Sequence, residues 1–270
     1  MTEHRPRYPI YVISKGRYKK PLTVNWLNGD GTDFRIVVEP QERYHYASVV
    51  DPSKILVLPF SNLGLGSIPA RNWVWEHAIS EGHERHWILD DNIRHMRKRS
   101  IVNGAMKRPI CGSNTGFFMM EQLADRYENV AILGPNYSMF APDTQKIPPF
   151  RVNTHVYSCI LIRNDIPQRW RGRYNEDTDL CLQVLAGGLC TVQVQAFVVD
   201  KMQTMTMKGG NTTQLYKGDG RLVMARSLER LWPGIVKVTR RFGHPQHSVN
   251  WSRFRMPLKL KPEHEKEKNQ

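Results

Sequence analysis

Two aspartates and an asparagine, Asp90, Asp91 and Asn92, directly follow the apolar run at residues 87–89. That run is too short for a helix and is typical of a buried central strand. Carboxylates at the end of a buried strand repel one another and lose hydration unless a cation or a hydrogen-bond donor pairs with them. The motif therefore indicates a cation or nucleotide site, or else a strand that ends in an ordinary acidic turn.

Two further polar clusters are expected at the same edge of a sheet. SKGR at residues 14–17 follows the first predicted strand, and Arg71 with Asn72 opens a predicted helix. Lys15 and Arg71 can pair with phosphate charge, helix-start amides can donate to phosphate oxygens, and the two aspartates can face ribose and metal. The alternatives are a basic turn and a helix start exposed to water.

Composition limits the class of protein. The 270 residues can form one large domain, and 40% of them are apolar. No apolar run approaches the roughly 20 residues that span a bilayer, and the N-terminus has no signal-peptide core. The four cysteines show no CxxC pairing. These features predict a cytoplasmic protein without a membrane partner.

The charge balance is strongly basic. Lysine and arginine total 39 against 25 acidic residues, a net charge of +14. Such a field attracts polyanions, although a merely solvated basic surface remains the alternative. Much of the excess lies in KGRYKK and RHMRKR, which flank the clusters above.

The elements that must position these clusters alternate along the chain. Strands are predicted at residues 9–13, 34–38, 55–58, 87–89, 130–133, 156–162 and 192–199, with helices at 67–82 and 121–129 and another after Asn175. This alternation predicts an α/β fold, a mostly parallel sheet with helices on both faces. We expect a single domain over residues 1–258 and a charged, disordered tail over 259–270.

Three quoted segments carry a family resemblance. GSIPARNWVWEHAISEGHERHWILDDN resembles the ARN helix and DxD strand of GT-A-fold glycosyltransferases, YNEDTDLCLQVLAGG resembles their xED motif, and RRFGHPQHSVNW resembles the segment that supplies a metal-binding histidine. Together with GGN and LERLWPGIV, the pattern over residues 8–256 is similar to the phage and kinetoplastid glycosyltransferases associated with TET/JBP-type oxygenases. Asn92 departs from the DxD pattern, because a neutral amide is a weaker ligand than a carboxylate.

This resemblance implies a GT-A-like, Rossmann-type domain that uses a nucleotide-sugar, expected to be a UDP-sugar, and a divalent metal, Mn²⁺ or Mg²⁺. It implies donor-binding residues at Ser14, Lys15, Arg17, Glu39, Arg71, Asn72 and Asp90. It implies metal ligands at Asp91, with Asn92 as a substitute, and at His244 or His247.

The acceptor implied by the resemblance and the charge is a hydroxymethylated pyrimidine, such as 5-hydroxymethylcytosine, in DNA that is single-stranded or has its target base flipped. The enzyme would then be phage-encoded and work in the host cytoplasm. Asp177 is the expected general base, because a carboxylate at a helix start stays ionised. Glu176 is the second choice, and Asp179 is expected to be structural.

Several segments of the sequence fit more than one role. Trp170, Trp251 and Phe254 can stack on bases or lie in the core, and residues 201–220 can form a lid or a plain loop. A glycan or protein acceptor is the nearest alternative. A nucleotidyltransferase would show a Gly-rich phosphate loop after the first strand, and a non-enzymatic nucleic-acid-binding protein would not need the acidic clusters.

Overall fold

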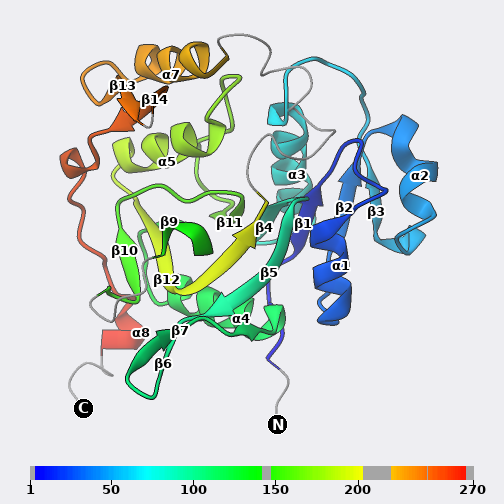
Figure 1. Cartoon of the computed structure of the whole chain (residues 1–270), viewed down its shortest axis with the longest axis horizontal. Coiled ribbons are helices and arrows are strands. Elements are labelled where there is room, and N and C mark those ends of the chain that lie inside the picture. Colours follow the sequence, from blue (N-terminus) through cyan, green and yellow to red (C-terminus); the bar gives the residue numbers. More distant parts are fainter. Residues whose placement is uncertain (1–3, 142–146, 203–219, 242, 266–270) are drawn as a thin grey trace.

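A computed structural model describes residues 4–141, 147–202, 220–241 and 243–265 of the chain (Figure 1). Ten strands form one central sheet: β1 (Ile10–Ile13), β2 (Arg35–Val38), β3 (Ile55–Val57), β4 (Arg85–Asp90), β5 (Ile93–Lys98), β8 (Ile110–Cys111), β9 (Val130–Tyr137), β10 (Phe150–Val152), β11 (Cys159–Arg163) and β12 (Cys190–Lys201). Two hairpins stand apart from it: β6 (Ser100–Val102) with β7 (Ala105–Lys107), and β13 (Val236–Arg241) with β14 (His244–Val249).

The sheet is mixed but mostly parallel. Its order is β3-β2-β1-β4-β11-β9-β12-β5-β8, with β10 beside β12. Strands β1 to β4 pair in parallel, as do β9 and β12, whereas β11, β5 and β10 run the other way. The predicted α/β class is confirmed, and every predicted strand is present.

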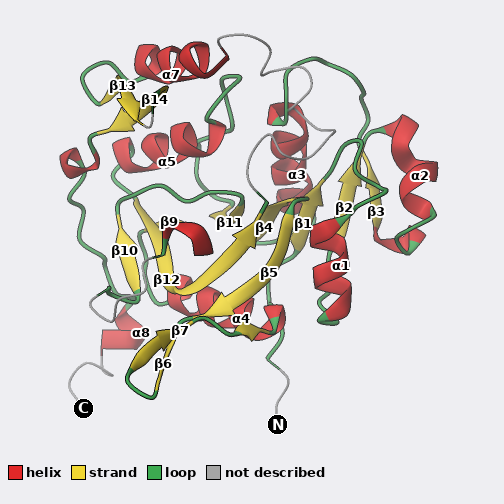
Figure 2. Cartoon of the chain, viewed as in Figure 1, coloured by secondary structure: helices red, strands yellow, loops and turns green. Residues whose placement is uncertain are grey.

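Helices cover both faces of the sheet (Figure 2). They are α1 (Leu22–Gly29), α2 (Arg43–Ala47), α3 (Ile68–Ser80), α4 (Ser113–Asp125), α5 (Glu176–Ala186), α7 (Gly220–Leu231) and α8 (Pro262–Glu265). Short 3₁₀ turns are η1 (Pro40–Glu42), η2 (Pro52–Lys54), η3 (Ser138–Phe140) and η4 (Trp251–Arg253). The helices over 67–82 and after Asn175 are confirmed, whereas the one predicted at 121–129 overlaps only the end of α4, which runs from Ser113 to Asp125.

Two hydrophobic cores follow from the alternation of side chains along each strand. On β1, Ile10 and Val12 pack with residues of α1 and α4, whereas Tyr11 packs with residues of α3 and α5 on the opposite face. The same division separates Trp87 from Ile88 on β4. All these side chains are almost fully buried, and burying one large apolar side chain contributes roughly 1.5–3 kcal/mol. The carboxyl ends of β1 and β4 are thereby fixed side by side.

A third, smaller core holds α5 in place. Leu182 of α5 packs with Leu228 of α7 and with Val236 at the start of the β13–β14 hairpin. In Figure 1, α7 and this hairpin lie beside α5 at one end of the molecule. The acidic start of α5 is therefore supported from the side away from the sheet.

The first residues of the charged tail contact the folded domain. Lys259 donates its backbone N–H to Asn129 at 2.9 Å, Leu260 forms a bridge with Tyr127, and α8 follows. These contacts use backbone groups, which a charge-based prediction does not consider. Residues 266–270 lie outside the described residues. No helix in the described part of the chain is both long and apolar enough to cross a membrane.

Candidate active site at the end of β4

The carboxyl ends of β1 and β4 meet at one edge of the sheet, because Ile13 of β1 pairs in parallel with Asp90 of β4. Ser14 follows β1, and Glu39 follows β2, the next parallel strand. Ligands of open α/β sheets bind outside the carboxyl ends of the strands. The sequence-predicted clusters are thus brought together where a ligand is expected.

Asp90 is the centre of a dense polar network. One carboxylate oxygen accepts from Arg71 at 2.8 Å, and the other accepts from Ser158 at 2.7 Å and from Lys201 at 2.9 Å. Burial alone would raise the pKa of Asp90, but the positive charges of Lys201 and Arg71 hold that pKa well below its ordinary value. The Asp90 side chain is ionised at neutral pH, with 23% of its surface exposed.

Lys201 was not predicted as a site residue. Its ammonium donates to Asp90, to Ser158 at 2.6 Å and to the hydroxyl of Tyr137 at 3.3 Å. Burial alone would lower the pKa of Lys201, but the negative charge of Asp90 raises it above its ordinary value. A fixed positive charge therefore lies between two hydroxyls and the predicted donor carboxylate.

Ser158 closes this network with a strained backbone. Its φ of 56° lies in the left-handed region, which costs energy for a residue with a Cβ. Because its single hydroxyl hydrogen goes to Asp90, Ser158 accepts from Tyr137 at 2.6 Å as well as from Lys201. Such strain is often found where a side chain is held for function.

Asp91 points to the other side of β4. It accepts from the hydroxyl of Ser14 at 2.6 Å and forms an ion pair with Arg17. Tyr46 donates to Ser14 at 2.5 Å and accepts from the backbone N–H of Arg17 at 3.1 Å. Burial raises the pKa of Asp91 despite the opposing charge of Arg17. Through these contacts Asp91 stabilises the loop that follows β1.

The remaining predicted donor residues divide into two groups. Lys15 pairs with Glu39 at 2.7 Å and with Asn62 at 3.0 Å, at the partly exposed rim beyond β1 and β2. Asn72 instead bonds both backbone groups of Trp170, accepting at 3.0 Å and donating at 2.8 Å. The Asn72 side chain therefore fixes the loop that contains Trp170, and both its amide oxygen and its amide nitrogen are used in doing so.

Arg71 joins the two acidic clusters. Its guanidinium is 4% exposed, contacts Asp90 and lies 3.5 Å from a carboxylate oxygen of Glu176. It also lies over the ring of Trp170 at 4.7 Å. One of its terminal nitrogens, Nη1, is buried without a hydrogen-bond partner in the described structure. That N–H group is available to an anionic ligand.

The acidic start of α5 faces this arginine. Glu176 accepts from Ser67 at 2.8 Å, and Asp177 accepts from the backbone N–H of Thr178 at 2.7 Å. Burial and the adjacent charge of Glu176 raise the pKa of Asp177 to about 7, against the opposing charges of Arg71 and Lys201. A carboxylate with a pKa near neutrality is suited to take a proton.

Asp179 has a structural role. Its side chain is fully buried and accepts from Arg171 at 2.9 Å, from Trp232 at 2.7 Å and from Gln183 at 2.8 Å. It ties α5 to the preceding loop and to the segment after α7. Asn175 precedes α5, but its amide donates to the carbonyl of Met224 at 3.0 Å and forms no side-chain cap.

Three aromatic side chains were left with two alternatives, base stacking or a core position. Trp170 is 2% exposed and packed under Arg71, which is a core position. Trp251 packs with both the α5 side of the sheet and the core under α7, and Phe254 packs in that same core. The predicted lid at residues 201–220 lies largely outside the described residues.

Oxygen donors that fit a divalent cation lie at Asp90 and Asn92. The amide oxygen of Asn92 is buried and accepts no hydrogen bond from the described residues, and Asp90 remains partly exposed. Mg²⁺ and Mn²⁺ need only one or two protein oxygens when substrate phosphates and water complete the shell. Both carboxylates already accept from protein donors, but the side chain of Asp91 is 7% exposed against 23% for that of Asp90, so Asp90 is the more accessible of the two.

The predicted histidine ligands, His244 and His247, lie on β14. His244 is exposed and His247 half-buried on β14, and within the described structure neither forms a hydrogen bond or ion pair with Asp90 or Asp91. Among the described residues, no three or more His, Cys, Asp or Glu side chains gather to hold a metal ion by themselves.

Comparison with known proteins settles the family. The model of the TET-associated glycosyltransferases matches residues 8–210, more than half of the chain. The chain belongs to this family. It is a glycosyltransferase, and the matched range contains β4, α3, α5 and Lys201 but not the β13–β14 hairpin. No curated protein sequence matches this TET-associated glycosyltransferase.

Among solved structures, a candidate nucleotide-diphospho-sugar transferase from Desulfovibrio desulfuricans G20 is similar at 12% identity. The match covers 70% of this chain and 80% of that one, with a TM-score of 0.37. A score this low carries no argument about fold or activity.

Proposed function

We propose that this glycosyltransferase moves a sugar from a UDP-sugar to the hydroxyl of a hydroxymethylated pyrimidine in DNA. The observation that carries the proposal is the network of Asp90, Arg71 and Lys201, which reaches from the end of β4 to the acidic start of α5. It supplies positive charge for a leaving diphosphate on one side and a carboxylate for proton transfer on the other.

The donor occupies the side of β4 that faces β1 and β2. Lys15 and Glu39 line the rim for the nucleoside, and Ser14 and Arg17 are positioned by Asp91. The unused N–H of Arg71 and the ammonium of Lys201 face the diphosphate. Fixed cations in a partly buried site stabilise charge that develops on the leaving group without having to reorganise.

The reaction forms one bond and breaks another at the anomeric carbon. The hydroxymethyl oxygen bonds to that carbon as the bond to the donor phosphate oxygen breaks, and its electron pair leaves with the nucleoside diphosphate. The hydroxyl proton passes to Asp177, whose pKa near 7 allows it to accept the proton and to release it afterwards. Glu176, held by Ser67 and Arg71, keeps a second negative charge beside Asp177.

A divalent cation, Mn²⁺ or Mg²⁺, would be held by Asp90 and Asn92 and would neutralise diphosphate charge when bound. This assignment differs from the one made from sequence, in which Asp91, with Asn92 as a substitute, and His244 or His247 were the ligands. The contacts of Asp91 with Ser14 and Arg17 favour a positioning role for that residue.

The net charge of +14 supports DNA as the acceptor, since a polyanion is attracted to a basic protein. The resemblance to enzymes that glycosylate hydroxymethylated pyrimidines supports the same acceptor. With that acceptor, the enzyme would act in the cytoplasm of a phage-infected cell, where the DNA is made.

The test is a transfer assay with defined acceptors. UDP-sugars are supplied with duplex or single-stranded oligonucleotides that carry 5-hydroxymethylcytosine, 5-hydroxymethyluracil or unmodified bases, and products are identified by mass spectrometry. We expect a sugar adduct on a hydroxymethylated oligonucleotide and none on the unmodified one. Transfer only to a glycan or peptide would overturn the DNA acceptor and leave the glycosyltransferase family in place.

A further inference from the structure

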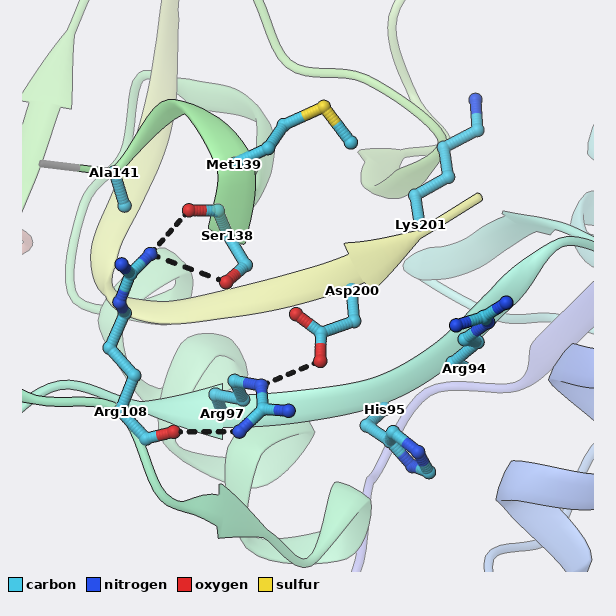
Figure 3. A pocket seen from close by; sticks show the side chains of 9 residues that line it. All are labelled: Arg94, His95, Arg97, Arg108, Ser138, Met139, Ala141, Asp200 and Lys201. Carbon is cyan, nitrogen blue, oxygen red and sulfur yellow. Dashed lines mark hydrogen bonds and ion pairs between the residues drawn. The ribbon is translucent and has the colours of Figure 1, made fainter. Parts of the chain in front are cut away.

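A basic pocket of about 710 Å³ opens beside the Asp90 network (Figure 3). It is lined by residues from β5, from η3, from the loop before β8 and from the end of β12: Arg94, His95, Arg97, Arg108, Ser138, Met139, Ala141, Asp200 and Lys201. Lys201 belongs to both the pocket wall and the Asp90 network. The pocket and the candidate active site are therefore adjacent and share Lys201.

The pocket wall carries a net positive charge. Its acidic residue, Asp200, is paired with Arg97 at 2.6 Å. Arg97 also donates to the carbonyl of Arg108 at 2.9 Å, and Arg108 donates to both the carbonyl and the hydroxyl of Ser138. These contacts, drawn in Figure 3, hold two guanidinium groups in fixed positions. Arginines preorganised in this way are suited to phosphate oxygens.

Arg94 reaches the pocket through an irregularity in the sheet. Asp200 pairs with His95, but the next residue, Lys201, pairs with Ile93, so Arg94 is an extra residue on β5. A bulge of this kind re-aims a side chain and is common next to active sites. Arg94 is exposed, and in the described structure it forms no hydrogen bond or ion pair. Its positive charge is available to a ligand.

Met139 lines the pocket, and Phe140 follows it in η3. Met139 and Phe140 of η3 are 56% and 59% exposed. The ring of Phe140 lies 5.7 Å from that of Tyr137, which in turn contacts Lys201. Proteins that unstack a duplex often insert an exposed apolar side chain of this kind between base steps.

We propose that this pocket binds the phosphates of duplex DNA next to the target base, with Arg94 as a phosphate contact and Phe140 as the wedge that replaces the flipped base. The inference rests on the proposed DNA acceptor and specifies how that acceptor is held. A hydroxymethyl group inside a duplex cannot reach Asp177, so the base must leave the stack. The wedge then fills the space that the base has left.

The test compares Arg94→Ala and Phe140→Ala with Arg35→Ala, which removes an exposed arginine at the opposite, amino end of β2. The probe is a duplex with one 5-hydroxymethylcytosine and, in a second version, 2-aminopurine at the target position. Binding is measured by anisotropy without donor over a range of salt concentrations.

We expect Arg94→Ala to weaken duplex binding roughly fivefold at about 0.15 M salt and to reduce the slope of log K against log salt by about 0.9, the effect of one phosphate contact. We expect Phe140→Ala to reduce the 2-aminopurine fluorescence that binding induces and to lower turnover on the duplex. Phe140→Leu should restore most of the induced fluorescence and most of the turnover on the duplex. On a single-stranded acceptor, Phe140→Ala should turn over as fast as wild type. Donor KM should stay unchanged in both alanine variants.

Two results would overturn the proposal, and they are distinguishable. If wild type glycosylates the duplex and the Arg94 and Phe140 variants match Arg35→Ala in binding, salt slope and fluorescence, the pocket is not the docking site and the proposed function stands. If wild type glycosylates no DNA, the proposed acceptor and this inference both fail.

Discussion

The ammonium of Lys201 lies 2.9 Å from a carboxylate oxygen of Asp90, although 111 positions separate the two residues in the sequence. The contact joins the end of β12 to the end of β4 across β11 and β9. It brings a permanent positive charge to the place where the predicted donor diphosphate leaves.

Replacing Lys201 by methionine should lower kcat by about 10²–10³-fold, the usual loss for one preorganised electrostatic group. The matched control is Lys98→Met, at an exposed position near the end of β5. Steady-state kinetics and a thermal melt of each variant separate catalysis from folding. A Lys201→Met enzyme with the kcat of the control would show that this charge does not act in the reaction.

The activity should depend on the protonation of Asp177. Because its pKa is raised to about 7, kcat/KM should rise with pH through that region as the carboxylate forms. Asp177→Asn should lose about 10²–10⁴-fold in turnover while it keeps DNA and donor binding. A wild-type profile that is flat between pH 6 and 8 would assign the proton transfer to another group.

The same residue gives a prediction about stability. The folded protein holds the Asp177 proton more tightly than the unfolded chain, so its contribution to the free energy of unfolding is complete below the ordinary pKa of 3.8 and is lost as pH rises towards about 7. Asp177→Asn removes this pH dependence and should melt higher than wild type at alkaline pH. Denaturant titrations of both proteins across this range measure the difference.

Arg71 should matter for both stability and donor binding. Its guanidinium is buried against two carboxylates, so Arg71→Ala leaves Glu176 without its cation and Asp90 with Lys201 alone, and should cost about 3–5 kcal/mol in unfolding free energy. Arg71→Lys keeps the charge but removes the planar, bidentate donors and should weaken UDP binding in calorimetry with a smaller loss of stability. Unchanged UDP affinity in a folded Arg71→Lys protein would place the diphosphate elsewhere.

The affinity for Mn²⁺ should depend on whether the side chain at position 92 offers a charged oxygen, a neutral oxygen or none. Asn92→Asp adds a charged ligand and should tighten Mn²⁺ binding in the presence of UDP, whereas Asn92→Ala should weaken it. Titration calorimetry of each variant measures this directly, and a chelator should lower wild-type turnover until Mn²⁺ or Mg²⁺ is restored. Equal Mn²⁺ affinity in all three proteins would remove Asn92 from the ligand set.

The sequence predicted the parts of the site that local patterns encode. Asp90 follows an apolar strand, and Asp177 opens a helix, so both could be recognised within a short window. Lys201 could not, because its role depends on β12 ending beside β4, and the polar segment that follows it resembles an ordinary loop. Ser158 carried no local signal either, since its function depends on a left-handed backbone inside a strand connection.

Other features could not be predicted from the sequence for physical reasons of the same kind. Trp170, in a run of arginines, had the composition of a nucleic-acid contact, but it is covered by Arg71 from a distant helix. The short strands β6, β7 and β8 lie in a charged stretch without clear alternation, and α1 is a single short helix of mixed polarity. Such elements are stabilised by their neighbours rather than by their own pattern.

The extra residue on β5 also constrains how the chain can evolve. Asp200 and Lys201 are consecutive residues of opposite charge, one directed to Arg97 and the other to Asp90. A slide of β12 by one position in one direction would bring Asp200 against Asp90 and set two carboxylates together, and a slide in the other direction would bring Lys201 against Arg97. Mispaired strands are thus rejected by charge repulsion as well as by packing, and length changes in this part of the family should be confined to the segments outside β5 and β12.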